Sequence, residues 1–381
     1  MSIKSSTIYF VGLDVHKESV TAAVFRGRDA EPMRVDRLNN DAKSLRRYFE
    51  RLAKTGEVRA CYEASGAGYV LQRSLVEWGY ACELAAPSLI PRRPGDHRKT
   101  DRRDAIKIGR DFRDDRLTLI HIPSATDERV RDVVRCRETF QREIVKSRHY
   151  ILKFLRRRGF IYRQGTHWTM RHMNWIRCLL EPDTLADDDR MVLSEYLTLL
   201  EFKLQRRDAL DRRIEELALM PRYKPAVDRL RCFRGIRTQS AMVLATELGD
   251  LRRFESPRQL MAYVGLVPRE NSSGDRRRLG AITKAGNARV RHVLVQAAWN
   301  YRRRPAVGKA LKQRQEAQPP EVIAHAWKCQ HRLYRVFHRL AERKPRQLAA
   351  TAVARELIGF IWAVLHDLDI TQLHTEVSNA A

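Results

Sequence analysis

Four carboxylates occupy positions from which they could share one metal site. Asp14 ends the apolar part of TIYFVGLDVHK, and Glu63 ends a second apolar run, EVRACYE. Asp101 and Asp104 lie three residues apart in KTDRRDA, where a helix is expected to begin, so they share one helix face. A carboxylate buried at the end of a strand requires a cation beside it, either a basic side chain or a metal ion.

Carboxylates gathered in this way repel one another unless divalent cations bind between them. Mg²⁺ prefers oxygen ligands, and Mg²⁺ ions bridged by such acids can orient a nucleophile and stabilise the transition state of a phosphodiester reaction. Each acid also has a simpler explanation. Lys and Arg side chains flank Asp101 and Asp104, and Glu63 precedes a turn-like SGAG. Together, at the ends of suitable elements, the four acids favour a Mg²⁺ site.

A second group of residues could supply a nucleophile. Ser272 and Ser273 lie in ENSSGDRRR, a composition typical of a turn, and Gly274 permits an unusual backbone there. A serine that attacks a phosphodiester needs a base for its proton and cations for the phosphate charge. Arginine suits the second task because its planar guanidinium group matches the geometry of phosphate. The basic residues expected to bind nucleic acid around the serines are Arg276, Arg277, Arg278, Lys284, Arg289 and Arg291.

The charge of the chain predicts a polyanionic partner. Its 381 residues carry 73 Lys and Arg against 46 Asp and Glu, a formal net charge of +27. Such an excess is typical of proteins that bind nucleic acid with salt-sensitive affinity. There is no long apolar run, signal peptide or lipidation signal, so we expect no membrane partner. The six cysteines are scattered without a CxxC pair, which fits a reducing cytoplasm.

Short apolar runs alternate with helical patterns over the first 115 residues, which predicts an α/β domain with a mixed sheet. The expected strands are Thr7–Lys17, Ser19–Phe25, Met33–Leu38, Glu57–Tyr62 and Tyr80–Ala85, and the expected helices are Asp41–Ala53, Gly68–Trp78 and Thr100–Phe112. In this arrangement Asp14 and Glu63 each close a strand, and Asp101 and Asp104 begin a helix.

The remainder of the chain reads as helical. Asp127–Arg158 and Leu193–Leu219 have apolar seams that predict a helical hairpin or coiled coil, although two ordinary amphipathic helices would show a similar pattern. A loop is expected over 265–283, and an apolar helix over Leu348–Leu368 should lie in a core or an oligomer contact. We therefore expect three parts: residues 1–120, a coiled-coil oligomerisation segment at 121–221, and a mainly α-helical domain at 222–381 with the serine loop and a helical tail.

Several of these segments resemble one known family. GLDVHK, YEASGAG and KTDRRDA are similar to signature segments of the DEDD transposases of the insertion sequence 110 family. The stretch GLVPRENSSGDRRRLGAITKAGNARVRHVLVQAAW resembles the C-terminal transposase segment of that family. The resemblance implies a ribonuclease H-like (RuvC-like) nuclease domain whose four acids are Asp14, Glu63, Asp101 and Asp104. It also implies a catalytic serine directly before a glycine, which matches Ser273, with Ser272 as the alternative.

The function implied is that of a DNA transposase or recombinase. The resemblance implies a Mg²⁺-binding acidic site, a covalent phosphoserine–DNA intermediate, and guidance by a structured non-coding RNA. We expect a homo-oligomer, either a dimer or a tetramer. The acids and the serine could act within one chain or, in such an oligomer, across subunits. We expect such a protein in the bacterial cytoplasm, associated with the nucleoid.

Three other functions are compatible with parts of the sequence. A ribonuclease H-like endonuclease or junction resolvase would need only the acids and would hydrolyse DNA. An actin-like ATPase would have a glycine-rich phosphate turn after the first strand, whereas Val15–Ser19 reads VHKES. A nucleic-acid-binding protein without catalysis would have no use for the four acids.

Overall fold

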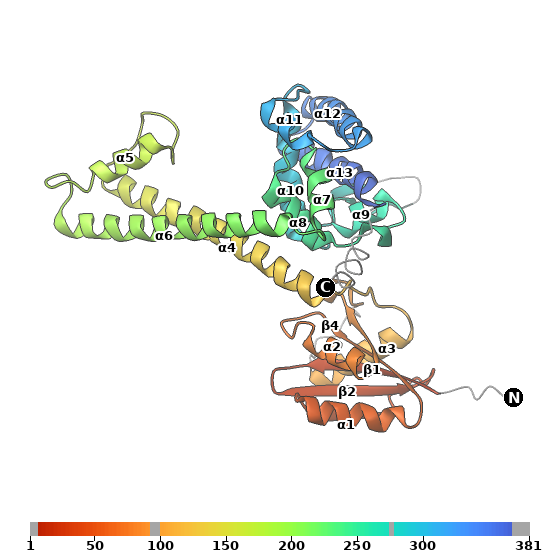
Figure 1. Ribbon diagram of the computed structural model, residues 1–381. Coiled ribbons are helices and arrows are strands. Elements are labelled where there is room, and N and C mark those ends of the chain that lie inside the picture. The colour runs from red at the N-terminus through yellow and green to blue at the C-terminus, as the bar shows by residue number, and fades with distance from the viewer. Residues whose placement is uncertain (1–6, 92–99, 274–277, 368–381) are drawn as a thin grey trace, which may run out of the picture. The chain divides into compact units, whose positions relative to one another are not determined.

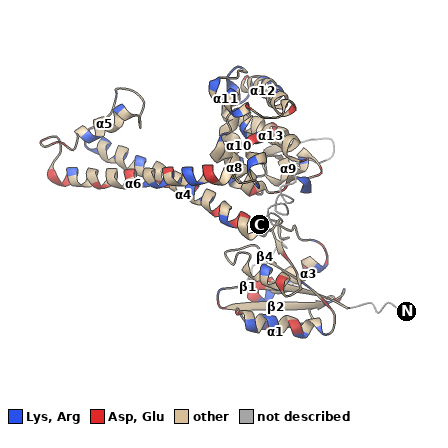
Figure 2. Ribbon diagram, viewed as in Figure 1, with Lys and Arg blue, Asp and Glu red and all other residues tan. Residues whose placement is uncertain are grey.

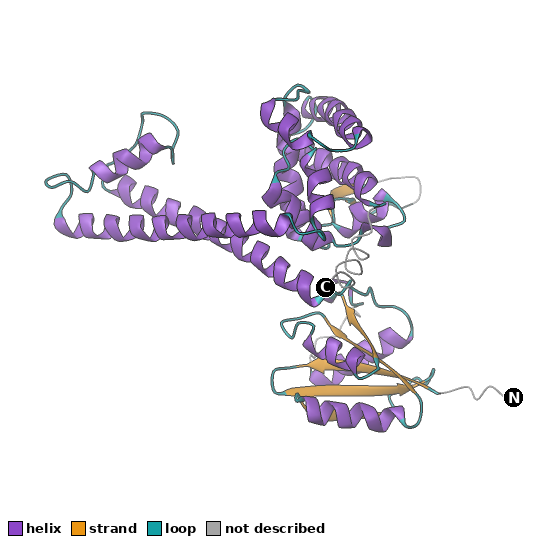
Figure 3. Cartoon of the chain, in the orientation of Figure 1, coloured by secondary structure: helices purple, strands orange, loops and turns teal. Residues whose placement is uncertain are grey.

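The structure is a computed structural model that describes residues 7–91, 100–273 and 278–367. Its contacts divide the chain into two compact units, with the boundary in the sequence between Pro123 and Ser124 (Figure 1). The first unit is an α/β domain and the second is almost entirely helical (Figure 3). This confirms the fold class expected for both halves of the chain, whereas the RuvC-like assignment and the three-part division stay predictions.

One five-stranded mixed sheet forms the framework of the first unit. Its strand order is β3-β2-β1-β4-β5, in which β1, β2 and β3 pair antiparallel and β1, β4 and β5 pair parallel. The strands are β1 (Ile8–Val15), β2 (Ser19–Arg26), β3 (Arg34–Asn39), β4 (Glu57–Glu63) and β5 (Ala81–Ala85). All five lie where the sequence predicts a strand.

Helices cover both faces of this sheet. They are α1 (Ala42–Ala53), α2 (Val70–Glu77), the short helix η1 (Pro87–Leu89) and α3 (Asp101–Arg113). Alternate residues of β1, including Val11 and Leu13, pack with α1 and α2 in one apolar cluster. Gly12 lies on the other face, against α3. Because side chains alternate along a strand, Asp14 belongs to the face that α3 covers.

A long helical hairpin begins the second unit. It consists of α4 (Ala125–Arg157), α5 (Met170–Cys178) and α6 (Asp187–Ala218). Helices α4 and α6 pack along each other, and apolar side chains from both, together with Ile176 of α5, form one cluster. The sequence predicts this hairpin. Its coiled-coil character and its expected role in oligomerisation remain predictions.

The rest of the second unit is a helical bundle around one large core. Its elements are α7 (Lys224–Arg231), α8 (Thr238–Leu248), η2 (Leu251–Arg253), α9 (Pro257–Tyr263), β6 (Pro268–Glu270), β7 (Leu279–Ile282), α10 (Ala288–Ala298), η3 (Trp299–Arg302), α11 (Lys309–Gln315), α12 (Pro320–Ala341) and α13 (Arg346–Leu365). The strands β6 and β7 form a short hairpin inside the stretch that was expected to be a loop.

The expectation that the chain has no long apolar run is wrong for helix α13, which is long and apolar enough to cross a membrane by length and composition alone. In the fold it packs against α9, α10 and α12, and its apolar side chains belong to the core of the second unit. The sequence pattern is compatible with either a core position or an oligomer contact. The packing accounts for the apolar character of α13 as that of a core helix.

Candidate active site

The register of two neighbouring strands places two of the predicted acids at equivalent positions, directly after the last paired residues. Strands β1 and β4 are parallel, and their register runs through the pair Leu13 and Tyr62, so Asp14 and Glu63 are the next residues on each strand. Leu13 and Tyr62 are fully buried. The carboxyl ends of parallel neighbouring strands lie at the same edge of a sheet, so both acids emerge where the buried interior ends.

Glycine allows α3 to approach β1 at backbone distance. A Cβ atom on Gly12 would lie 2.2 Å from the carbonyl oxygen of Ala105 and 2.2 Å from the amide nitrogen of Gly109. A Cβ on Gly109 would lie 2.8 Å from the ring of Phe25 and 3.0 Å from the Gly12 nitrogen. The two glycines therefore set the separation of helix and strand, and this separation brings the first turn of α3 close to Asp14.

A Gly12→Ala substitution tests this packing. The added methyl group would collide with backbone atoms of α3, which cannot move as a flexible side chain can. We expect a loss of about 3 kcal/mol in the free energy of unfolding, a typical cost of overpacking, together with weaker metal binding. Urea unfolding measures the first effect. Gly66→Ala is the control because a Cβ atom there would have no other atom within 4 Å, and an equal loss in both variants would contradict the account.

The first turn of α3 presents the other two acids. Thr100 caps the helix in an extended conformation, and its side chain accepts a hydrogen bond from the backbone N–H of Arg103 at 3.3 Å. Asp101 and Asp104 both lie in the first turn. The positive end of the helix dipole stabilises carboxylates at this position, so the local structure favours acids here before any metal binds.

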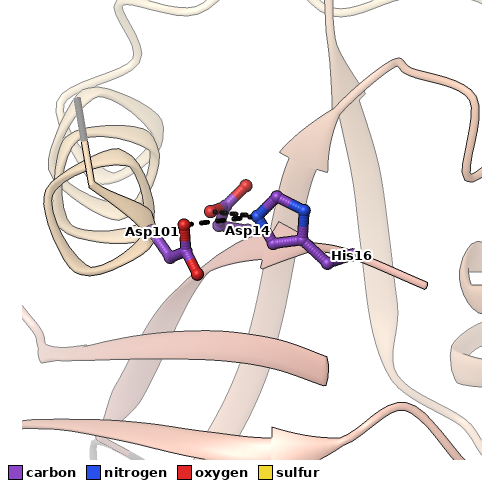
Figure 4. A group of neighbouring side chains, drawn as sticks. All are labelled: Asp14, His16 and Asp101. Carbon is purple, nitrogen blue, oxygen red and sulfur yellow. Dashed lines mark hydrogen bonds and ion pairs between the residues drawn. The ribbon is translucent and has the colours of Figure 1, made fainter. Parts of the chain in front are cut away.

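Three side chains converge where β1 meets α3 (Figure 4). His16 Nε2 lies 3.2 Å from Asp14 Oδ2 and 3.4 Å from Asp101 Oδ1. One ligand atom from each of these residues lies within 4.8 Å of the other two. The Asp14 side chain is only 20% exposed, whereas those of Asp101 and His16 are about half exposed. The cluster therefore has a sheltered acid at its base and faces solvent through the other two residues.

The surroundings of Asp14 raise the pKa of its carboxyl group. Burial raises its pKa above the usual 3.8, His16 lowers it, and the negative charges of Asp101 and Asp104 raise it again. The net direction is upward. A divalent cation bound here would supply the positive charge that the carboxylate lacks.

The structure brings the predicted acids together to different degrees. Asp14 and Asp101 share the close group, and Asp104 is near enough to act on the Asp14 charge. Glu63 stands exposed at the end of the neighbouring strand, and its carboxylate is outside the close group. Two carboxylates and one imidazole are ligand types that divalent cations accept, so the residues present fit a metal site.

His16 is a site residue that the sequence prediction did not include. It follows Asp14 by two positions in GLDVHK, and the period of a strand puts such residues on one face. This spacing could have revealed it, but a prediction based on oxygen ligands for Mg²⁺ considers carboxylates alone. The structure adds an imidazole to the expected set.

Two hollows border the cluster. One, of about 480 Å³, is lined by the acids Asp36 and Asp101 and by the basic residues Arg37 and Arg102. The other, of about 520 Å³, is lined by His16 and Lys17 together with apolar residues of α1 and α2. Cations beside a metal site are suited to hold phosphate oxygens, so the surroundings favour an anionic substrate.

A His16→Ala substitution tests whether the imidazole contributes to metal binding. Loss of one of three close ligand groups should weaken the binding of Mg²⁺ or Mn²⁺ by about tenfold or more, the scale on which ligand-supporting groups act. Isothermal titration calorimetry measures the affinity directly. Lys17→Ala is the matched control because the Lys17 side chain is 94% exposed, and unchanged affinity in His16→Ala would remove the imidazole from the site.

The two candidate serines follow strand β6 in the β6–β7 hairpin of the second unit. Ser272 Oγ donates a hydrogen bond to Glu270 Oε1 at 2.9 Å and accepts one from the backbone N–H of Arg278 at 3.1 Å. Both serines are exposed, but Ser272 also helps to close the hairpin through these two hydrogen bonds. Gly274, which follows Ser273, lies outside the described residues.

The predicted basic residues around the serines differ in what they contact. Arg289 forms an ion pair with Glu138 at 2.7 Å, and Arg291 donates three hydrogen bonds to backbone carbonyls. These two side chains hold the local fold. Arg278 and Lys284 are exposed and remain available to a phosphate. Arg276 and Arg277 lie outside the described residues.

A buried ionic network supports the base of this region. Glu247 of α8 receives two hydrogen bonds from Arg135 of α4, at 2.7 and 2.9 Å, and one from Asn287 at 2.7 Å. Asn287 in turn caps α10 by accepting the backbone N–H groups of Arg289 and Val290. Burial raises the pKa of Glu247, but Arg135 and its other partners outweigh this effect and hold the pKa below the usual 4.5. The network thus joins three helices through one ionised carboxylate.

We expect Glu247→Gln to destabilise the protein by about 3–5 kcal/mol, because it removes the carboxylate partner of Arg135 and of the buried Arg131. The lowered pKa means that the ion pair stabilises the fold above about pH 4.5 and that this contribution is lost as the pH falls through the folded-state pKa. Urea unfolding at several pH values measures both effects. Glu216→Gln breaks an exposed pair with Arg213 and should cost less than about 1 kcal/mol. Equal costs would show that burial of the network is unimportant.

Comparison with known proteins assigns the chain to a family. A family described as Transposase IS116/IS110/IS902 family matches residues 227–313, and a DEDD family of IS110 described as Transposase matches residues 11–158. A putative transposase, y4qE, from Sinorhizobium fredii is 38% identical over 361 residues, which cover 94% of this chain and 88% of that protein. The chain belongs to the IS110 family of transposases.

Two further relatives align over most of this chain and most of their own length. The transposase for insertion sequence element IS1533 from Leptospira borgpetersenii is 29% identical over 343 residues, which cover 89% of this chain and 98% of that protein. A probable family 20 transposase from Pseudomonas aeruginosa is 28% identical over 360 residues, which cover 93% and 96% of the two chains. The protein is therefore an enzyme that cuts and rejoins DNA, and membership of a DEDD family points to the use of a divalent metal.

Proposed function

We propose that this IS110-family transposase cuts and rejoins DNA by a serine nucleophile that works with a Mg²⁺-binding acidic site. The observation that carries the proposal is the convergence of Asp14, His16 and Asp101, whose ligand atoms lie within 4.8 Å of one another. An exposed Ser273 on a basic hairpin supports the second half. The acids and the serine belong to separate units of the chain, so they could act within one chain or across subunits.

The proposed metal ligands are Asp14, Asp101 and His16, with Glu63 and Asp104 as further carboxylates at the edge of the group. A bound Mg²⁺ would supply Lewis acidity toward a phosphate oxygen and would neutralise its charge. The chain itself orients the DNA. Arg37 and Arg102, which line the hollow beside Asp101, are placed to bind neighbouring phosphates. An acid at strand end β1, another at strand end β4 and two at the start of α3 also support the ribonuclease H-like (RuvC-like) assignment.

In the proposed first step, Ser273 Oγ attacks a phosphorus atom of the DNA backbone. A new Oγ–P bond forms, the P–O bond to the leaving strand breaks, and the leaving oxygen takes up a proton. The serine proton passes to a base at the site. In the second step a hydroxyl end of another strand attacks the phosphoserine and releases Ser273. The number of phosphodiester bonds is thus conserved, and no net hydrolysis occurs.

Arg278 and Lys284 are the described basic residues best placed to neutralise the phosphate beside the serine, since both are exposed on the hairpin or directly after it. Ser272 stays the alternative nucleophile, because its hydrogen bond to Glu270 is the geometry of a nucleophile with its base. The same hydrogen bonds also close the hairpin, which favours Ser273 as the reacting residue.

Metal-dependent hydrolysis is the second candidate. A ribonuclease H-like endonuclease or junction resolvase needs only the acidic site, and the first unit contains that site by itself. The two mechanisms differ in one product: hydrolysis leaves no covalent bond between protein and DNA. Trapping with denaturant during the reaction, followed by gel separation, detects such a bond.

A structured non-coding guide RNA is a further part of the proposal. The net charge of +27 is consistent with the binding of both RNA and DNA. Expression of the chain with its flanking non-coding DNA, followed by purification in high salt and sequencing of bound RNA, tests this directly. One enriched RNA from the flanking DNA is expected, and a random sample of cellular RNA would contradict guidance.

We also propose a dimer or tetramer held by the α4–α6 hairpin, in the cytoplasm and associated with the nucleoid. The hairpin exposes large apolar side chains that a partner could cover: Val145, Tyr150, Leu199 and Phe202. Light scattering of the purified protein measures the number of subunits.

A further inference from the structure

Helix α12 carries a basic surface that neither the acidic site nor the serine hairpin uses. From Val322 to Ala341 the sequence has no acidic residue, and Glu321 and Glu342 lie at its two ends. Exposed basic residues repeat along the helix at spacings that share one face. These residues, which we call the α12 stripe, are Lys328, His331, Arg332, Arg335 and Arg339. Figure 2 marks the Lys and Arg positions of this helix in blue.

Most of this charge has no acidic partner. Within the described residues, the ion pair of the stripe is that of Arg332 with Glu356, at 3.0 Å. Arg335 donates to a backbone carbonyl, which leaves its charge uncompensated. Exposed charge of one sign along a helix binds an extended polyanion with little rearrangement.

An aromatic row runs beside the stripe. Trp327 is 41% exposed, and its ring lies 4.5 Å from the His331 ring at an interplanar angle of 79°. One and two turns beyond His331, the rings of Tyr334 and His338 lie 4.4 Å apart. An exposed indole held edge to face by its neighbour offers a flat face on which a nucleic-acid base can stack.

More basic residues adjoin the His338 end of this row. His338 Nε2 contacts the backbone carbonyl of Arg302 at 3.0 Å. Arg234 donates to the carbonyls of Arg303 and Arg304, at 3.2 and 2.7 Å, and so fixes the backbone of the segment 302–304. The three arginine side chains of this segment are exposed. The aromatic row therefore has the stripe beside it and a fixed run of arginines at its His338 end.

We propose that the α12 stripe, Trp327 and the segment 302–304 bind a single strand of DNA. A duplex hides the faces of its bases, so exposed aromatic rings would gain nothing from it, whereas an unpaired strand offers both phosphates and base faces. Joining a cut strand to a new partner requires that strand to leave its old duplex, so the proposed reaction would itself present this ligand. The inference deepens the proposed function and rests on strand cutting, but not on the identity of the nucleophile.

Fluorescence anisotropy of full-length, nuclease-treated protein with a labelled single-stranded DNA oligonucleotide tests the proposal. Arg335→Gln/Arg339→Gln should weaken binding about tenfold at moderate salt and lower the slope of log affinity against log salt by about 1.4, which corresponds to two phosphate contacts. Trp327→Ala should weaken binding about tenfold, and Trp327→Phe should restore most of it by stacking. Thermal melting verifies that each variant is folded.

The matched control is Arg47→Gln/Arg51→Gln on α1. These two arginines are exposed, have the same spacing, and include a side chain that donates to a backbone carbonyl one turn earlier. Affinity in this control should stay at the parental value. The proposal is overturned if the α12 variants bind single-stranded DNA as tightly as the parent does. It is also overturned if their affinity for duplex DNA falls by the same factor, or if only their affinity for RNA falls. Serine adduct formation, measured in parallel, reports on the proposed function separately.

Discussion

Ser273→Ala is expected to abolish the covalent attachment of DNA to the protein and to slow strand cutting by at least about a thousandfold, the scale on which loss of a nucleophile acts. The reason is that the substitution removes the attacking hydroxyl, while the neighbouring Ser272 hydroxyl is held in hydrogen bonds to Glu270 and to the backbone of Arg278. Binding of DNA should persist, because the arginines and the acidic site are unchanged. Denaturing gels with end-labelled DNA measure both the adduct and the cut product.

Ser272→Ala is the matched control for that experiment, since it removes the same hydroxyl from the neighbouring residue. It should retain the adduct, with a loss that reflects a loosened hairpin, because Ser272 bonds to Glu270 and to the Arg278 backbone. The reverse result, an active Ser273→Ala and an inactive Ser272→Ala, would make Ser272 the nucleophile and Glu270 its base. Full cutting without an adduct in the parent would favour hydrolysis.

Asp14→Asn should have two opposite effects. Strand cutting should fall by about a thousandfold, because loss of a metal-binding carboxylate removes several kcal/mol of transition-state stabilisation. Thermal stability without metal should rise, because burial and two neighbouring acids raise the Asp14 pKa and so make its ionised form unfavourable in the fold. Differential scanning fluorimetry in chelator measures the second effect.

The pH dependence of this stability follows from the direction of the shift. Below about pH 3.8 Asp14 is protonated in both the folded and the unfolded chain, so parent and Asp14→Asn should melt alike. Above that pH the unfolded chain ionises more readily than the folded one. As the pH rises through the raised folded-state pKa, the melting temperature of the parent therefore falls below that of the variant. Asp29→Asn, an exposed acid in the same unit, is the control. A lower melting temperature for Asp14→Asn at neutral pH would contradict strain at this acid.

The sequence predicted the framework of the first unit because each strand there has a local signal. Buried runs such as those of β1 and β4 end abruptly at a charged residue, and Asp14 and Glu63 follow from that pattern. Asp101 and Asp104 follow from the signal for the start of a helix. Direct contact between backbone atoms at Gly12 and Gly109 has no such signal, since it depends on a helix that begins about ninety residues later. The sequence therefore predicts that the acids belong to one group, but it does not predict the distances between them.

Other features escaped prediction for similar reasons. Strands β6 and β7 are short and include Pro268 and Gly280, so their composition reads as a loop. Glu247 looks like one more acid in a helix, and its role depends on Arg135, which lies 112 positions earlier in the chain. Pairing over such separations is set by tertiary packing, which a single sequence does not display.

One measurement tests the central claim most directly. The protein is allowed to react with DNA in the presence of Mg²⁺, the reaction is stopped with denaturant, and the adduct is digested with protease and nuclease and sequenced by mass spectrometry. The account predicts a phosphonucleotide on Ser273, which depends on metal and is absent from Asp14→Asn. A phosphonucleotide on any other residue, or cut DNA with no adduct at all, would contradict it.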